Sequence, residues 1–210
     1  MAYKVLNNVS VKDVTSSDLL SLKTDLLVIV INKNTKDKVV NQLAKDVSSH
    51  LKESGSSVLV PNAKSFNAKN VLLVKGFQDS DQIHKLISMY QSIAQKGNQL
   101  KAKDISIMPG TVYPKGKCEM WLIEMVAKTI ESNVYIFSET CNKTAKKPSV
   151  KKLNILVSSL TKSDLIKAKN AAKKGYAIGE GVNSAKYLGD LPANHCTPRI
   201  IEKKVKAMTK

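Results

Sequence analysis

A helical segment rich in small residues restricts the fold of this chain more than any other stretch. Residues 163 to 188 carry small and apolar side chains at steps of three and four, and Thr161 supplies a suitable N-cap, so one long helix is predicted there. Gly175, Gly179 and Gly181 lie inside it, and each interior glycine costs about 1 kcal/mol relative to alanine. We therefore expect another backbone to pack closely against this face. A break between two shorter helices is the alternative.

The residues after this helix predict a turn and a second helix. Gly189 suits a helix end and Pro192 forbids continuation, whereas Pro198 suits the first position of a new helix. This second helix places Ile201 and Val205 on one apolar face with nothing after it to bury them. We expect the apolar face around Leu188, Leu191, Ile201 and Val205 to be disordered or buried in a neighbouring chain, and residues 189–210 to be the first part of a further domain.

Strands and helices alternate along the first three quarters of the chain. Strands are predicted at residues 2–6, 25–31, 57–61, 70–76, 104–108, 134–138 and 153–157. Helices are predicted at residues 35–53, 80–97 and 117–131. This alternation predicts an α/β fold, a three-layer α/β/α sandwich with a mixed, mostly parallel central sheet, followed by the long helix.

The net charge is +17, from 34 Lys and Arg against 17 Asp and Glu, and it is concentrated near the carboxyl end. Such an excess attracts nucleic acid or another polyanion, so a basic nucleic-acid-binding module of the α/β class is an alternative function. A lysine bias on solvated faces explains the same charge. The candidate polyanion-binding residues are Lys143, Lys146, Lys147, Lys151 and Lys152.

Groups that could form an active site are scarce. Neither the cysteines nor the histidines have the spacing of a zinc site, and the adjacent pair His195 and Cys196 is more typical of a turn than of a catalytic dyad. We therefore expect no catalytic and no metal-ligating residue in this chain. No apolar run approaches the length of a membrane span, and the first residues do not resemble a signal peptide, so a cytoplasmic location without membrane contact is expected.

The long helix and its turn resemble a known family. The sequence AIGEGVNSAKYLGDLPANHCTPRII, residues 177–201, is similar to the interdomain segment of the leucyl (cytosol) aminopeptidase family, in which an alanine- and glycine-rich helix leads to a turn with Pro and Asn and then to a short helix. The segments DLLVIVI, GSSVLVP and NVLLVKGF resemble the amino-terminal domain of that family, which has a macro-domain-like fold. An ADP-ribose-type ligand site is suggested by this fold analogy alone.

The resemblance implies a domain organisation. Residues 1–160 would form the macro-like domain, residues 161–188 the interdomain linker helix, and residues 189–210 the start of a truncated catalytic peptidase domain. The family's members are metalloexopeptidases that release amino-terminal residues from peptides with two divalent metals, Mn or Zn, held in the carboxy-terminal domain. The signature NTDAEGRL of that domain is absent here, so this chain alone is expected to be inactive and to act in assembly or regulation.

The resemblance also implies partners. These are the chain's own carboxy-terminal catalytic domain, further copies in a hexamer and the peptide substrates of the parent enzyme, with DNA as a further candidate partner.

Overall fold

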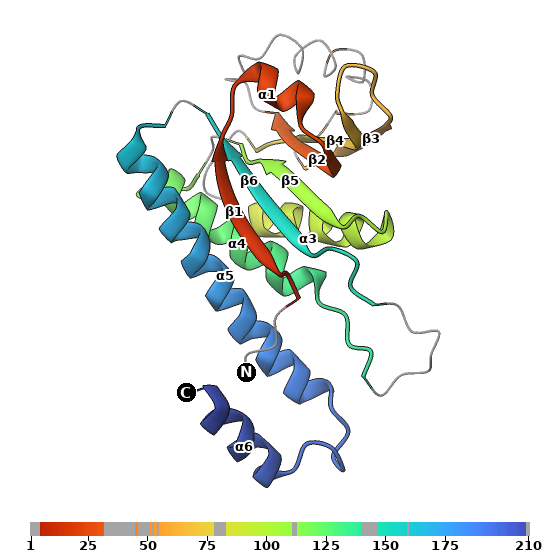
Figure 1. Ribbon diagram of the computed structural model, residues 1–210, viewed down its shortest axis with the longest axis vertical. Helices are drawn as coiled ribbons and strands as arrows, with labels where there is room; N and C mark the ends of the chain where they lie inside the picture. Colours follow the sequence, from red (N-terminus) through yellow and green to blue (C-terminus); the bar gives the residue numbers. More distant parts are fainter. Residues whose placement is uncertain are drawn as a thin grey trace.

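The computed structural model describes residues 5–31, 45, 51, 53, 55–77, 83–110, 113–139, 147–158 and 160–208. Its centre is a six-stranded sheet with the order β1-β6-β5-β2-β4-β3, in which only β3 is antiparallel to its neighbour (Figure 1). The strands are β1 (Asn8–Asp13), β2 (Thr24–Ile31), β3 (Ser57–Pro61), β4 (Ala68–Lys75), β5 (Asp104–Met108) and β6 (Lys152–Val157). The prediction of a mixed, mostly parallel sheet is confirmed.

Helices cover both faces of this sheet. They are α1 (Ser16–Ser21), α3 (Ile83–Gln99), α4 (Glu119–Val134), α5 (Lys162–Asp190) and α6 (Pro198–Met208). Helices α3 and α4 and the first half of α5 share one hydrophobic core with the sheet, whereas α1 belongs to a second core that also contains Leu51 and Phe66. The three-layer α/β/α arrangement predicted from the sequence is therefore present.

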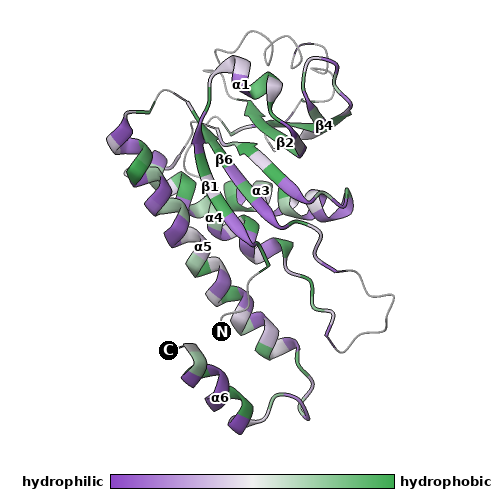
Figure 2. Cartoon of the chain, viewed as in Figure 1, coloured by the Kyte–Doolittle hydropathy of each residue, from purple (hydrophilic) through white to green (hydrophobic). Residues whose placement is uncertain are grey.

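The sequence of strand β2 is apolar without interruption because both of its faces are buried. Leu26 and Val28 belong to the core beneath α3 and α4, and Leu27 and Ile29 belong to the opposite core. All four are fully buried. A strand in the middle of a parallel sheet is covered on both faces, so both sets of alternating side chains are apolar. In Figure 2 the hydrophobic colouring is concentrated on the sheet, whereas α5 and α6 have mixed colouring.

The first strand lies later in the sequence than predicted. The expected strand at residues 2–6 is wrong at Val5 and Leu6, which are not in the sheet, and residues 2–4 lie outside the described part. The backbone N–H groups of Val5 and Leu6 donate to the side chain of Glu131 in α4. Because these donors are already used, sheet pairing begins only at Asn8, where β1 joins β6.

The expected strand at residues 134–138 is also wrong. Val134 ends α4, and the residues after it form no strand. The carbonyl of Val134 accepts a hydrogen bond from Asn98 of α3, and the hydroxyl of Tyr135 donates to Asp190 of α5. This apolar run therefore contacts two helices and does not pair with the sheet.

Two further differences concern helices. Helix α1 was not predicted, although its capping box, in which Thr15 and Asp18 exchange hydrogen bonds, is a recognisable signal. The helix predicted at residues 35–53 falls almost entirely outside the described residues. Among the helices that the structure does describe, none is long and apolar enough to cross a membrane.

Candidate functional site

Helix α5 is a single helix from Lys162 to Asp190 and extends well past the sheet (Figure 1). The hydroxyl of Thr161 caps its start by accepting a hydrogen bond from the backbone N–H of Asp164 at 3.1 Å. The glycine-rich part, residues 175–181, is helical throughout. The alternative of two shorter helices is therefore wrong, and the glycines must be explained within a continuous helix.

Two of the three glycines lie where α5 touches α4. A Cβ atom on Gly175 would lie 2.0 Å from the backbone oxygen of Glu124, and one on Gly179 would lie 2.7 Å from the Cβ of Glu131. The predicted close approach of a second backbone is thus confirmed, since no larger residue fits at Gly175 while α4 stays in place. Gly181 is different, because a Cβ there would meet no atom within 4 Å.

A buried carboxylate fixes α5 to the start of the chain. Glu131 is fully buried and accepts hydrogen bonds from the backbone N–H of Val5 at 2.8 Å, from that of Leu6 at 3.0 Å, and from the side-chain amide of Asn183 at 2.9 Å. Burial raises the pKa of Glu131, and the three hydrogen bonds partly oppose that effect. The hydroxyl of Tyr176 also donates to the carbonyl of Leu6 at 2.7 Å. Glu131 was not predicted from the sequence, because a glutamate in a helix with several charged residues resembles an ordinary surface side chain.

The far end of α5 leads through the predicted turn to α6. The Pro192 carbonyl accepts hydrogen bonds from the backbone N–H groups of His195 and Cys196, so this pair is part of the turn. The ammonium group of Lys204 lies 3.9 Å from the centre of the Tyr187 ring and holds α6 beside α5.

The apolar face of α6 is formed but uncovered in this chain. Ile201 is 38% exposed and Val205 is 53% exposed, whereas Leu188 and Leu191 are half-buried. The structure places Ile201 and Val205 in a regular helix. Burial of this face against a neighbouring chain stays a prediction.

The candidate polyanion-binding lysines are only partly described. Two of them lie outside the described residues, namely Lys143 and Lys146. Lys147, Lys151 and Lys152 are exposed, and the backbone N–H groups of Lys151 and Lys152 both donate to the carbonyl of Lys103, at 2.7 and 3.2 Å. The backbones of three lysines are therefore adjacent where β5 and β6 begin, and the position of Lys103 there was not predicted from the sequence.

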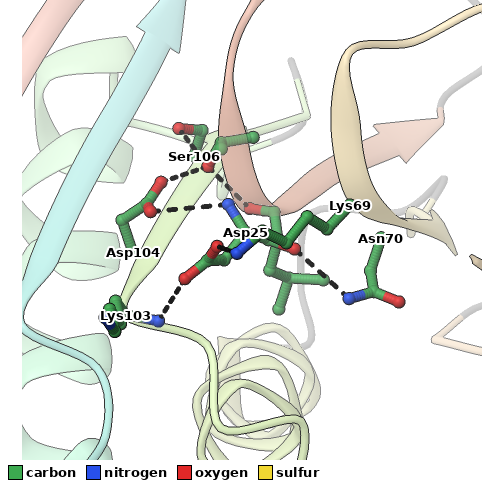
Figure 3. Close-up of polar contacts among 8 residues, drawn as sticks. Asp25, Lys69, Asn70, Lys103, Asp104 and Ser106 are labelled. Carbon is green, nitrogen blue, oxygen red and sulfur yellow. Dashed lines mark hydrogen bonds and ion pairs between the residues drawn. The ribbon is translucent and has the colours of Figure 1, made fainter. Parts of the chain in front are cut away.

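A polar network lies beside these lysines, at the starts of β2, β4 and β5 (Figure 3). Asp25 pairs with Lys69 at 2.5 Å and accepts a hydrogen bond from the Lys103 backbone N–H at 2.8 Å. The hydrogen bond from Lys69 is the main reason why the pKa of Asp25 lies below its usual value. Asp104 accepts from the hydroxyl of Thr24 and from the Asp25 backbone N–H.

The network continues across the sheet through uncharged side chains. The hydroxyl of Ser106 donates to Thr24 at 3.0 Å, Asn154 donates to Ser106 at 3.0 Å, and Ser10 donates to Asn154 at 2.9 Å. Ligand sites of open α/β sheets lie at the carboxyl ends of the strands, whereas the carboxylates of this network lie at the amino ends. Its polar groups have partners within the chain, so we interpret it as a structural network that fixes how the strands begin.

The next question is whether side chains in the described part of the chain could hold a metal ion. No cluster of three or more His, Cys, Asp or Glu side chains there could hold a metal ion. Asp25 and Asp104 are the two carboxylates labelled in Figure 3, and both already accept hydrogen bonds from protein donors.

Comparisons with known proteins agree on one group of enzymes. No protein-family model matches the chain. It is 30% identical over 180 residues to a probable cytosol aminopeptidase of Vesicomyosocius okutanii, covering 84% of this chain and 35% of that protein. It is 28% identical over 211 residues to one of Azotobacter vinelandii, covering 94% of this chain and 42% of the relative. The chain thus spans well under half the length of these relatives.

Solved structures show the same similarity in fold. A mutant of tomato leucine aminopeptidase superposes with a TM-score of 0.67 at 18% identity, over 95% of this chain and 41% of that one. The bottromycin maturation enzyme BotP, in complex with Mn, superposes with a TM-score of 0.62 at 15% identity, over 88% of this chain and 36% of that one. At these identities the superpositions show the fold and leave the chemistry open.

Proposed function

We infer that this chain, an amino-terminal domain of the leucyl aminopeptidase family, has a non-catalytic role in the assembly or regulation of an exopeptidase. The observation that carries this proposal is the asymmetry of α5. The helix is fixed to α4 through Gly175, Asn183 and Lys186, whereas the segment after it leads to α6 with Ile201 and Val205 exposed. Such a helix is suited to connect a finished domain to another one.

The exopeptidase activity belongs, in this proposal, to a carboxy-terminal domain with two divalent metals, Mn or Zn. The residues described here do not fit a metal pair, because no cluster of three candidate ligands exists among them and the paired carboxylates Asp25 and Asp104 are occupied by protein donors. We therefore derive no catalytic step for this chain. Its role would be to hold α5 and α6 in a fixed orientation against the catalytic domain.

An activity assay tests the non-catalytic role. The 210-residue chain is incubated with leucine p-nitroanilide and Mn²⁺, and the expected result is no release of nitroaniline. Turnover that copurifies with the chain and disappears with a chelator would overturn the proposal. A cytoplasmic location, a hexameric parent enzyme and peptide substrates complete the proposal, and the word cytosol in the names of the relatives supports the first of these.

The uncovered face of α6 gives a second test of the same role. If α6 packs on the catalytic domain, then Ile201→Asp and Val205→Asp weaken association of this chain with the separately produced catalytic domain in a pull-down. Lys203→Asp is the matched control, because it introduces the same side chain at an exposed position of the same helix. Equal association of all three variants would remove α6 from the interface.

Nucleic-acid binding is the second candidate, supported by the position of Lys103, Lys151 and Lys152 together at the amino ends of β5 and β6. Affinity for a DNA duplex, measured by fluorescence anisotropy, is expected to fall steeply as salt rises, because each neutralised phosphate releases counterions. Replacing Lys151 and Lys152 by Glu should weaken binding more than replacing Lys167 and Lys173 of α5. Absence of binding at low salt, or equal effects of the two pairs, would eliminate this candidate.

A further inference from the structure

Gly181 lies in the interior of α5, yet packing does not explain it. A Cβ atom there would meet nothing within 4 Å, whereas Gly175 and Gly179 both lie against α4. Gly189 also faces open space, but it is the next-to-last residue of the helix, where a glycine suits the helix end. Because glycine restricts the backbone less than any other residue, Gly181 is the point at which α5 bends most easily.

The apolar attachment of α5 ends before Gly181. Ala168 and Ala172 belong to the main hydrophobic core, and Leu165 and Tyr176 pack against it. The structure describes α5 along its whole length, and none of its residues beyond Tyr176 belongs to either core. Apolar burial is the main favourable contribution to packing, so the arm, which we define as residues 182–190, depends on other contacts.

Two side chains of the arm hold it on the end of α4. Asn183 is fully buried, and its amide donates to the backbone carbonyl of Glu131 at 3.0 Å and to the carboxylate of Glu131 at 2.9 Å. The ammonium group of Lys186 donates to the carbonyl of Ser132 at 2.6 Å. These carbonyls belong to the last turn of α4, where backbone acceptors lack helical donors and where a cation interacts favourably with the helix dipole. The contacts of Asn183 and Lys186 therefore form a polar latch between α5 and α4.

The docked arm has little else to stabilise it. Within the described part of the chain, Oδ1 of Asn183 is buried without a hydrogen-bond partner, which is unfavourable for the docked position. Other contacts of the arm go to residues after α4 that form no strand or helix. The hydroxyl of Tyr135 donates to Asp190 at 2.8 Å, and the rings of Phe137 and Tyr187 are 6.2 Å apart. A segment with so little apolar contact belongs to the least stable parts of a fold.

We propose that α5 is hinged at Gly181, so that the arm moves between a docked position, latched by Asn183 and Lys186, and an undocked one. The sheet and the first part of α5 stay in place during this motion, because the apolar core fixes them. Helix α6 follows the arm, since Lys204 lies 3.9 Å from the centre of the Tyr187 ring. This hinge goes beyond the proposed role in an aminopeptidase, because it is a property of the 210-residue chain itself.

A distance measurement on the 210-residue chain tests the hinge. Cys118 and Cys196 are free thiols at the start of α4 and in the turn beyond the arm, so spin labels on them report the position of the arm by double electron–electron resonance. Cys141 is replaced by serine in every variant, so that only two labels are present. The chain with an intact latch should give one dominant distance, and undocking should add a second one.

Variants of the latch should change the fraction of chains with the second distance. Lys186→Met should raise that fraction at least about twofold, and Asn183→Leu should raise it about tenfold, because it removes two hydrogen bonds. Lys174→Met is the matched control, since it breaks an exposed ion pair between α5 and α4, to Glu124 at 3.1 Å, on the other side of the hinge. This control should leave the fraction unchanged.

Variants of the hinge should act in the opposite direction. When added to Asn183→Leu, Gly181→Ala should lower the undocked fraction about fivefold, because alanine favours the straight helix over glycine. Gly189→Ala is the control, since its Cβ atom also meets nothing within 4 Å but lies beyond the latch. The proposal is overturned if all variants give one distance, if Lys186→Met and Lys174→Met behave alike, or if the two glycine variants do. Loss of hydrogen-exchange protection in β2 together with the docked distance would also overturn it, because the arm would then not move separately from the sheet.

Discussion

Replacing Gly175 by alanine tests the close contact between α4 and α5. The new Cβ atom would lie 2.0 Å from the Glu124 oxygen, 2.8 Å from its carbonyl carbon and 3.0 Å from its Cα. All three are backbone atoms, so no side-chain rotation can relieve the contact. Ordinary van der Waals contact begins at 3.4 Å, so the helices must separate by about 1.4 Å, which is 3.4 minus 2.0.

The expected loss of stability follows from two opposing effects. Overpacking of a tight contact costs about 1–3 kcal/mol, and a contact between two backbones is at the upper end of that range. Alanine in a helix interior returns about 1 kcal/mol relative to glycine. The free energy of unfolding of Gly175→Ala should therefore fall by about 2 kcal/mol. For a chain of this size the melting temperature should fall by about 4–8 °C.

Gly181 provides the matched control for this experiment. The same substitution in the same helix meets no atom within 4 Å, so Gly181→Ala should gain up to about 1 kcal/mol. Urea denaturation followed by circular dichroism measures both variants. Gly179→Ala should be intermediate, because its Cβ would lie 2.7 Å from the Cβ of Glu131 and 3.1 Å from the backbone oxygen of Lys128, less close than the 2.0 Å contact at Gly175. If Gly175→Ala is as stable as Gly181→Ala, the inferred contact between α4 and α5 is wrong.

Three further predictions concern single side chains. Burial raises the pKa of Glu131 above 4.5, so the folded state binds more protons than the unfolded state, and the contribution of Glu131 to stability falls as pH rises above that value. The Glu131→Gln variant should lack this pH dependence. Equal pH profiles of wild type and variant in urea denaturation would contradict the prediction. Lys69 lowers the pKa of Asp25 below 3.8, so the stability that this pair contributes is lost as pH falls through the lowered pKa. Lys69→Met should move the pKa of Asp25 upward in an NMR titration, and an unchanged pKa would show that the pair is not formed in solution. Thr161→Ala removes the N-cap of α5 and should cost about 1 kcal/mol, measured by thermal denaturation, and an unchanged melting temperature would contradict this role.

Much of the fold could be predicted because local patterns are strong. The apolar strand at Leu26–Val30, the amphipathic pattern of α3 and the small-residue helix α5 each require only short-range periodicity. The same patterns failed where tertiary contacts compete with the sheet. Val5 and Leu6 have the composition of a strand, but a distant carboxylate binds their amide groups.

The candidate sites were less predictable than the fold. The lysine-rich loop was visible in the sequence, but the position of Lys103 beside Lys151 and Lys152 depends on how β5 and β6 pair.

Periodicity and helix propensity are enough to predict that a glycine-rich helix follows an α/β domain and that another element packs against its small face, since three interior glycines are otherwise unfavourable. The identity of that element depends on the tertiary fold. Gly175 and Gly179 face α4, whereas Gly181 faces open space, and Glu131 joins α4, α5 and the first described residues. Periodicity specifies which residues share a face of a helix, but the partner of that face depends on contacts between residues far apart in the chain.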